Sequence, residues 1–419
     1  MTGRESGSLY YGWIVVVGCF LGSFVVFGLS YSFGVLADAI LAEFGRSRGL
    51  TSVAFGVQTV TLYVGGAGVG VLVDRYGSRR MLVLGGVVLC TGLVTTSLTG
   101  SLAAFVFTYG VLVGMGLSVV YVVSYATIPR WFDRRLGLAG GLASAGLGVG
   151  MLVVAPATDA LIARVGWRST MLVLAGGTAL AVVAAAALIR DRPAPADVPE
   201  DEFDGGFREQ APLTLRGGLS DVLRVARSPS FLALFLGWVL VYSTLYVVLS
   251  HLVLHVVDLG ISRGVGAAAL GALGGASAVG RVVIGHAADR VGRARTFATC
   301  SAVMGVATLS LIGATTPLAI LGFALLYGLA YGGNGALLAP LTADLFGREN
   351  IGAVFGLISG AFAVSGLFAP YLAGVAYDTL GTYDPVFVVV GIAAVLGAGA
   401  ILGAAHLQGP PESTSATVS

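Results

Sequence analysis

The sequence contains no lysine, so all 23 of its basic residues are arginine. Charge of either sign is scarce: Asp, Glu, Lys and Arg make up 11% of the 419 residues, against about 25% in soluble domains. Cysteine is rare as well, and Cys19, Cys90 and Cys300 lie in separate apolar segments without metal-binding or disulfide spacing. These absences exclude lysine as a functional group and argue against a soluble domain, a disulfide scaffold and a cysteine metal site.

The motifs of nucleotide-driven and covalent chemistry are also missing. The sequence has no Walker motif, no nucleophile elbow and no cluster of metal ligands. We therefore expect neither an enzyme nor a primary pump, and no cofactor, no resident metal and no nucleic-acid partner.

Apolar residues, by contrast, make up 56% of the chain, and 64 residues are glycine. Apolar runs long enough to span a bilayer recur along the whole length, and the glycines suit helices that pack closely through small residues. The first run is too long for the core of a cleavable signal peptide. We predict an all-α membrane protein with twelve transmembrane helices, at about residues 11–41, 50–72, 81–98, 102–127, 136–161, 169–189, 229–257, 264–287, 296–313, 317–340, 351–375 and 384–407.

A polar stretch divides these helices into two sets of six. It includes Arg190-Asp-Arg-Pro and the acidic run Glu200–Asp204, which cannot cross a membrane. We predict an N-terminal six-helix half (1–189), a linker (190–228), a C-terminal six-helix half (229–407) and a short tail (408–419).

The arginines orient this arrangement. With the N-terminus inside, seventeen arginines fall in inner loops or the linker and five in outer loops, namely Arg46, Arg48, Arg164, Arg168 and Arg263. This is the bias expected when both termini and the linker are cytoplasmic. We therefore predict a multi-pass protein of the inner or plasma membrane, with the lipid bilayer as its partner and a monomer as the functional unit.

The two predicted halves repeat each other. The segment Gly70–Gly77 matches Gly285–Gly292 at an offset of 215 residues, and the pair Tyr109-Gly110 matches Tyr327-Gly328 at 218. Two similar halves in the same orientation indicate parallel repeats related by an axis along the membrane normal.

These features resemble the major facilitator superfamily over essentially the whole chain. The loop Gly70-Val-Leu-Val-Asp-Arg-Tyr-Gly-Ser-Arg-Arg80 is similar to that superfamily's loop motif, and Gly285–Arg293 echoes it. The resemblance implies that these loops hold the cytoplasmic helix ends together in one state and release them in the other. The residues expected to do so are Asp74, Arg75, Arg79, Asp289, Arg290 and Arg293.

A narrower resemblance is to the monocarboxylate transporters and their prokaryotic relatives, with the oxalate–formate antiporters next. It is carried by Tyr10-Tyr-Gly-Trp13, Arg130-Trp-Phe-Asp-Arg-Arg-Leu-Gly137, the histidine-containing stretch Ser250–Ser262 and Gly280-Arg281. It implies that Arg281 binds the substrate carboxylate. A charge inside a membrane helix marks a functional site by default, although a side chain snorkelling toward the interface is an alternative.

The chain departs from these relatives at three places. Ser277 stands where the animal monocarboxylate transporters have an aspartate, and neither the lysine of their helix 1 nor that of the oxalate antiporters' helix 11 is present. One fixed positive charge suits one carboxylate, because a dicarboxylate would leave a buried charge unpaired.

Other side chains are placed by depth near the interface of the halves. We expect Tyr121, Tyr331, Asn334, Phe362, Tyr31, Ser277 and His251 to join Arg281 in binding the substrate. For the tyrosines and Phe362, helix packing is the competing interpretation, and for His251 it is a hydrogen-bonded packing role. We expect Asp38 and Asp159, at outer helix ends, to be solvated residues of the channel mouth.

The sequence thus predicts a secondary transporter of small monocarboxylates such as lactate or pyruvate, coupled to protons and working by alternating access. An organic-anion or oxalate/formate-type antiporter and a drug exporter of the same superfamily stay open as alternatives. A non-transporting sensor on this fold is less favoured, because only a short tail follows the last predicted helix.

Overall fold

The computed structural model describes residues 10–45, 47–132, 134–191, 224–346 and 351–407, and for residues 67, 71, 74, 289 and 351–353 only the backbone. Within these ranges the chain is helical, without any β-strand. The predicted all-α architecture is therefore confirmed.

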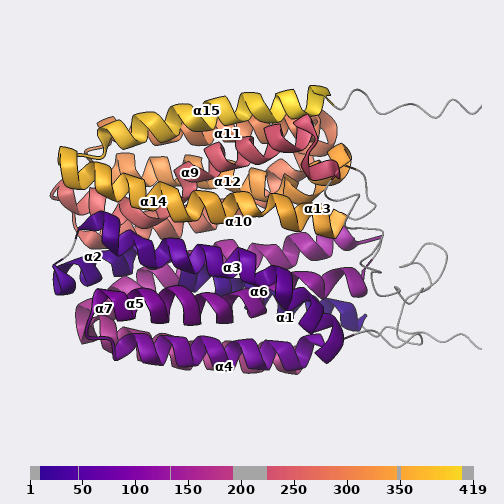
Figure 1. Ribbon diagram of the computed structural model, residues 1–419, viewed down its shortest axis with the longest axis horizontal. Coiled ribbons are helices and arrows are strands. Elements are labelled where there is room, and N and C mark those ends of the chain that lie inside the picture. The colour runs from indigo at the N-terminus through magenta and orange to yellow at the C-terminus, as the bar shows by residue number, and fades with distance from the viewer. Residues whose placement is uncertain (1–9, 46, 133, 192–223, 347–350, 408–419) are drawn as a thin grey trace, which may run out of the picture.

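The helices form two groups that follow one another along the chain (Figure 1). The first group, the N-terminal bundle, contains α1 (Tyr11–Tyr31), α2 (Phe33–Phe44), α3 (Arg48–Tyr76), α4 (Ser78–Ser97), α5 (Leu102–Phe105), the π-helical segment Val106–Val113, α6 (Gly114–Ala126) and α7 (Leu136–Leu188). The second group, the C-terminal bundle, contains α9 (Pro229–Asp258), α10 (Arg263–Val291), α11 (Arg293–Ser310), α12 (Pro317–Phe346), α13 (Ile351–Ile358), α14 (Gly360–Leu380) and α15 (Asp384–Leu407).

Several predicted helices are interrupted. The first breaks at Ser32 between α1 and α2, and the eleventh breaks at Ser359 between α13 and α14. The predicted fifth and sixth helices lie on either side of Gly166, the non-helical residue within the range of α7 (φ 77°, ψ 163°). A positive φ of this kind favours glycine, which has no Cβ to clash with the backbone.

Ten helical segments of the described chain are long and apolar enough to cross a membrane. Large apolar side chains such as Leu180, Leu318 and Val389 lie on the outer surface, where they are 73%, 80% and 66% exposed. Exposing so many large apolar side chains to water would be unfavourable, whereas in a bilayer they contact the lipid tails. The protein is therefore a multi-pass membrane protein, while the count of twelve membrane helices stays a prediction.

The two bundles contact each other through three main helix pairs: α3 with α14, α7 with α10, and α2 with α9. The first two pairs are equivalent under the internal repeat, because α3 and α10 begin 215 residues apart, at Arg48 and Arg263. In Figure 1 the N-terminal bundle (indigo to magenta) and the C-terminal bundle (red to yellow) lie one against the other.

Within the C-terminal bundle, α10 and α12 approach almost backbone to backbone. A Cβ atom added at Gly332 would collide with the backbone oxygen of Ser277, and one at Gly328 would collide with the backbone oxygen of Leu273. Small residues allow this approach between membrane helices. Its consequence is that Arg281 of α10 lies directly beside α12.

Candidate functional site

The charge inside α10 lies between α10 and α12. The guanidinium of Arg281 faces the ring of Tyr331, with its Cζ 5.9 Å from the ring centroid, and its Nε has no hydrogen-bond partner among the described residues. A Cβ at Gly335 would lie 2.6–2.7 Å from three guanidinium atoms, so the absence of a side chain there makes the space that the guanidinium occupies. A guanidinium whose buried Nε–H has no hydrogen-bond partner can donate to a bound anion.

A set of aromatic side chains begins at this guanidinium and extends across both bundles. Tyr121 and Tyr125 of α6 lie near Arg281, and their rings lie 4.8 Å apart. The ring of Tyr121 also lies 5.9 Å from that of Tyr63, which in turn lies 5.1 Å from Phe362 of α14. We call the set Tyr31, Tyr63, Tyr121, Tyr125, Tyr331 and Phe362 the aromatic cage.

The aromatic cage joins the two bundles. The hydroxyl oxygens of Tyr31 in α1 and Tyr331 in α12 lie 3.2 Å apart, within hydrogen-bond distance, although 300 residues separate them in the chain. Phe362 also packs on α9 of its own bundle, through Tyr242 (4.6 Å between centroids) and Trp238 (5.4 Å). The aromatic cage thus contains four of the residues predicted to join Arg281 in binding the substrate: Tyr31, Tyr121, Tyr331 and Phe362.

Asn334 and Ser277 lie differently. The amide nitrogen of Asn334 donates to Ser301 Oγ (3.1 Å) and Met304 Sδ (3.3 Å) on α11, and its Oδ1 has no partner among the described residues. Ser277 Oγ donates to the backbone oxygen of Gly274 (2.8 Å) within α10, and Ser277 is fully buried. Both side chains therefore form hydrogen bonds within the C-terminal bundle, and their predicted part in binding the substrate stays a prediction.

His251 belongs to a different polar network, at the end of the bundles where α3 and α10 begin. Its Nδ1 lies 2.8 Å from the Tyr383 hydroxyl, and its Nε2 lies 2.8 Å from the backbone oxygen of Pro370 and 3.2 Å from Ser52 Oγ. Both ring nitrogens are thus engaged by groups other than Arg281. Because the Pro370 oxygen can only accept, Nε2 carries the proton and Nδ1 accepts from Tyr383.

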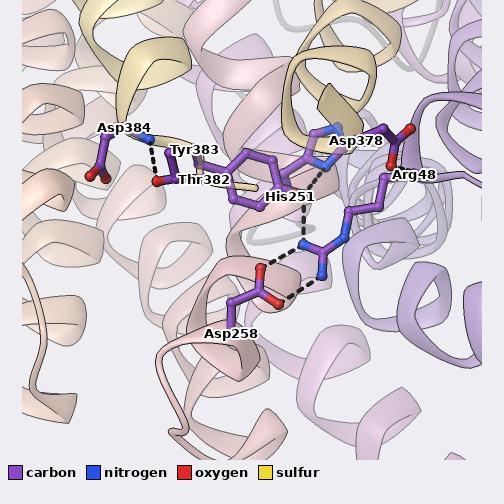
Figure 2. A network of polar contacts seen from close by, with 7 residues as sticks. All are labelled: Arg48, His251, Asp258, Asp378, Thr382, Tyr383 and Asp384. Atoms are coloured by element: carbon purple, nitrogen blue, oxygen red, sulfur yellow. Dashed lines mark hydrogen bonds and ion pairs between the residues drawn. The ribbon is translucent and has the colours of Figure 1, made fainter. Parts of the chain in front are cut away.

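The centre of this network is Arg48, the first residue of α3 (Figure 2). Its two Nη atoms donate to the carboxylate of Asp258 at the end of α9, at 2.6 and 2.7 Å, and Nη1 also donates to the Tyr383 hydroxyl at 3.0 Å. Burial raises the pKa of that hydroxyl, so Tyr383 stays protonated and donates a hydrogen bond to His251 Nδ1. The guanidinium also lies over the ring of Tyr377, 3.7 Å from its centroid.

Asp378 of α14 completes the Arg48 network from another direction. Its carboxylate accepts from the backbone nitrogens of Arg48 (3.0 Å) and Gly49 (3.1 Å), which are the first free N–H groups of α3. A carboxylate at a helix N-terminus is favoured by the helix dipole and by the unpaired N–H groups. The N-terminal bundle is thereby fixed to the C-terminal bundle by both the side chain and the backbone of Arg48.

Arg263, the first residue of α10, forms the corresponding contacts in the reverse direction. Its Nε donates to Asp159 of α7 at 2.6 Å, and its Nη1 lies 3.6 Å from Asp38 of α2. The expectation that Asp38 and Asp159 are solvated mouth residues is therefore wrong, since both are paired with an arginine of the other bundle. We call the contacts of Arg48 and Arg263 the paired arginine networks.

The sequence carries a repeated segment at these two arginines, and it is not among the predicted motifs. Gly45, Ser47, Arg48 and Gly49 match Gly260, Ser262, Arg263 and Gly264 at the same offset of 215 residues. Gly45 and Gly260 both have positive φ, 58° and 75°, and both directly precede the turn into their helix. The repeated Gly-x-Ser-Arg-Gly thus places a serine at the N-cap and an arginine at the first residue of both α3 and α10.

The loop-motif residues lie at the opposite helix ends. Gly77 and Gly292, again 215 residues apart, have φ values of 88° and 102° and start the helices that follow them. Arg75 and Arg290 are exposed, Arg79 donates its backbone N–H to Asp191 (3.2 Å), and Arg293 pairs with Asp344 (2.8 Å). The side chains of Asp74 and Asp289 lie outside the described residues, so their predicted role stays a prediction.

A metal site is not found in the described part of the chain, where no three His, Cys, Asp or Glu side chains gather. The candidate site consists of one guanidinium and the aromatic cage, and the Tyr31–Tyr331 contact places it between the two helical bundles. Sites at the interface of structural repeats are typical of secondary transporters.

Comparison with known proteins identifies the class. A family model described as Major Facilitator Superfamily matches residues 19–282 and 255–418. The chain belongs to the Major Facilitator Superfamily, and it is a transporter. Its fold is also that of a bacterial homolog to the human lysosomal transporter Spinster, in an inward-facing and unoccupied conformation, with a TM-score of 0.71, 15% identity and coverage of 96% of this chain and 97% of that one.

Within the superfamily the chain resembles the monocarboxylate transporters. It is 29% identical to Monocarboxylate transporter 13 of Bos taurus over 91% of this chain and 86% of that protein. It is 30% identical to Monocarboxylate transporter 11 of Homo sapiens (91% and 80%) and 28% identical to Monocarboxylate transporter 4 of Mus musculus (93% and 82%). The predicted family resemblance is therefore confirmed.

Proposed function

We propose that this protein carries small monocarboxylates such as lactate or pyruvate across the membrane, together with a proton, by alternating access. The observation that supports this most is the guanidinium of Arg281, which lies sheltered within a membrane helix with an unpartnered Nε. Arginine offers a planar pair of N–H donors that matches one carboxylate, and the aromatic cage supplies hydroxyls for the rest of a small substrate.

The proposed topology follows from the arginine distribution. It has twelve membrane helices in two halves, 1–189 and 229–407, with the linker and both termini in the cytoplasm. In this topology α3 and α10 both begin at the outer face of the membrane. The paired arginine networks then lie on the outer side, and the loop motifs lie on the inner side. The protein would act as a monomer in the cell membrane.

The direct test is uptake of radiolabelled lactate by the purified protein in proteoliposomes. We expect saturable uptake that unlabelled pyruvate inhibits and that oxalate, a dicarboxylate, inhibits far more weakly, because the single positive charge of Arg281 pairs with one carboxylate and leaves the second without a partner. Uptake of lipophilic cations without any uptake of lactate would instead favour the drug-exporter alternative, and strong exchange with oxalate would favour an oxalate/formate-type antiporter.

A glycine substitution tests the position of the guanidinium. In Gly335→Ala the new Cβ would overlap three guanidinium atoms of Arg281, so the guanidinium must move away from its present place. We expect the KM for lactate to rise about tenfold while the protein still folds, since the end of a flexible side chain is what gives way. Gly322→Ala is the matched control, because its Cβ on the same helix would meet no atom within 4 Å. Equal KM values for the two variants would contradict the proposed place of the carboxylate.

A further inference from the structure

The paired arginine networks show a reciprocity that neither the loop motifs nor the central site explains. Arg48 belongs to the N-terminal bundle and its acidic partners, Asp258 and Asp378, belong to the C-terminal bundle. Arg263 belongs to the C-terminal bundle and its partners, Asp159 and Asp38, belong to the N-terminal bundle. Each bundle therefore presents one arginine at a helix start. The Arg48 guanidinium pairs with Asp258 while its backbone N–H donates to Asp378, and the Arg263 guanidinium has both of its carboxylates as neighbours.

We propose that Arg48 and Arg263 form a two-part latch, duplicated with the internal repeat, that holds the two bundles together at the end where α3 and α10 begin. The latch must open for a substrate to reach Arg281 from that side. In the proposed topology this is the outer side, so the latch closes the outer entrance while the inner entrance is used. This inference rests on the alternating-access part of the proposed function.

The two parts of the latch differ in strength. The Arg48 pair with Asp258 is bidentate, its arginine side chain is 13% exposed, and Tyr383 and Tyr377 cover it. The Arg263 side chain is 24% exposed and holds one carboxylate at 2.6 Å and the second at 3.6 Å. Shielding from water strengthens a charge-assisted pair. We therefore expect the Arg48 part to hold the closed state and the Arg263 part to reinforce it.

His251 has a defined place in this device. Its Nδ1 accepts a hydrogen bond from the Tyr383 hydroxyl, whose oxygen in turn accepts from Arg48, so the imidazole fixes the hydroxyl that supports the guanidinium. Ser52, one turn into α3, ties the same imidazole to the helix that Arg48 begins, with its Oγ 3.2 Å from Nε2. His251 is thus a positioning residue of the latch.

The chain offers a matched control for the test. Arg168 pairs with Glu43 through its side chain at the same end of the molecule, but α7 and α2 both belong to the N-terminal bundle. Removing the Arg168 pair removes an ion pair that is more exposed than the latch pairs, without separating the bundles. The latch predicts a difference between Arg48 or Arg263 and Arg168, whereas a general role of ion pairs in folding does not.

The experiment measures how readily water reaches the interface beneath the latch. Leu249 of α9 is fully buried, and its backbone oxygen faces Gly34 of the other bundle. It lies nine residues before Asp258, or about 13 Å along the helix. Leu249→Cys is introduced after Cys19, Cys90 and Cys300 are replaced by alanine, and the protein in proteoliposomes is treated with a membrane-impermeant maleimide without any carboxylate present.

We expect slow labelling of this reporter protein and labelling at least ten times faster when Arg48→Ala and Arg263→Ala are combined. The pair Asp258→Asn and Asp159→Asn, which preserves side-chain size, should act in the same direction. Monodisperse elution establishes that each variant is folded, and complete labelling after denaturation establishes that its cysteine is reactive. A rise no larger than that caused by Arg168→Ala would overturn the proposal. Because lactate takes no part in the assay, the latch can fail while lactate transport holds, and the reverse.

Discussion

Replacing Arg281 by alanine is expected to lower lactate uptake at least a hundredfold while leaving the protein folded. The carboxylate of the substrate would then enter the aromatic cage without a counter-charge, and an unpaired buried anion is strongly disfavoured. A hundredfold loss corresponds to about 2.7 kcal/mol, which is within the range of a charge-assisted hydrogen-bonded pair. The measurement is initial uptake of labelled lactate at equal amounts of reconstituted protein.

Arg281→Lys distinguishes geometry from charge. Lysine keeps the positive charge but offers a single ammonium in place of the planar fork, so we expect uptake well below that of the unchanged protein. Folding is not expected to suffer, because the guanidinium contacts Tyr331 through its ring face and packs in the space left by Gly335 without an ion pair in the described residues. Full activity of Arg281→Ala would show that Arg281 only snorkels toward the interface.

An inward proton gradient alone is expected to drive lactate uptake into proteoliposomes by this protein. A small carboxylic acid with a pKa near that of an Asp side chain, ~3.9, is anionic at neutral pH. Moving one negative charge into a negative-inside compartment is opposed by about 2.3 kcal/mol per 100 mV, so accumulation needs a proton or an exchanged anion. Without uptake under this gradient, proton symport would be wrong and exchange or uniport would remain.

His251→Ala tests where the proton travels. Its ring nitrogens are engaged at the latch by Tyr383, Pro370 and Ser52, and arginine does not release a proton near neutrality. We therefore expect the gradient still to drive uptake in His251→Ala, at a reduced rate, because the proton accompanies the substrate as its carboxylate leaves Arg281. Complete loss of gradient-driven uptake, with exchange of labelled for unlabelled lactate intact, would assign the proton to His251.

The sequence by itself predicted the class of protein, because membrane burial constrains a chain at the level of composition. A bilayer requires long apolar helices, and a charged residue inside such a helix is rare and marks a functional site by default. Arg281 was accordingly found from its position in an apolar run, and the family resemblance rested on motifs such as Gly70–Arg80. The internal repeat was also readable, since duplicated segments keep their spacing along the chain.

Only the tertiary structure decided which side chains meet. Depth along a helix does not fix the angle about its axis, so it does not predict which neighbouring helix a side chain faces. Asn334 donates to Ser301 of α11 and Ser277 donates to the backbone of its own helix, contacts that no local pattern predicts. His251 lies at the latch because Arg48, Tyr383 and Pro370, far from it in sequence, gather around it.

The latch itself shows the same division. The repeated Gly-x-Ser-Arg-Gly was present in the sequence, yet the pattern gives no partner for either arginine. The partners of Arg48 lie 210 and 330 residues away, and Asp159 lies 104 residues from Arg263. Ion pairs over such separations depend on how two bundles dock, which is a property of whole helix faces and not of any local pattern.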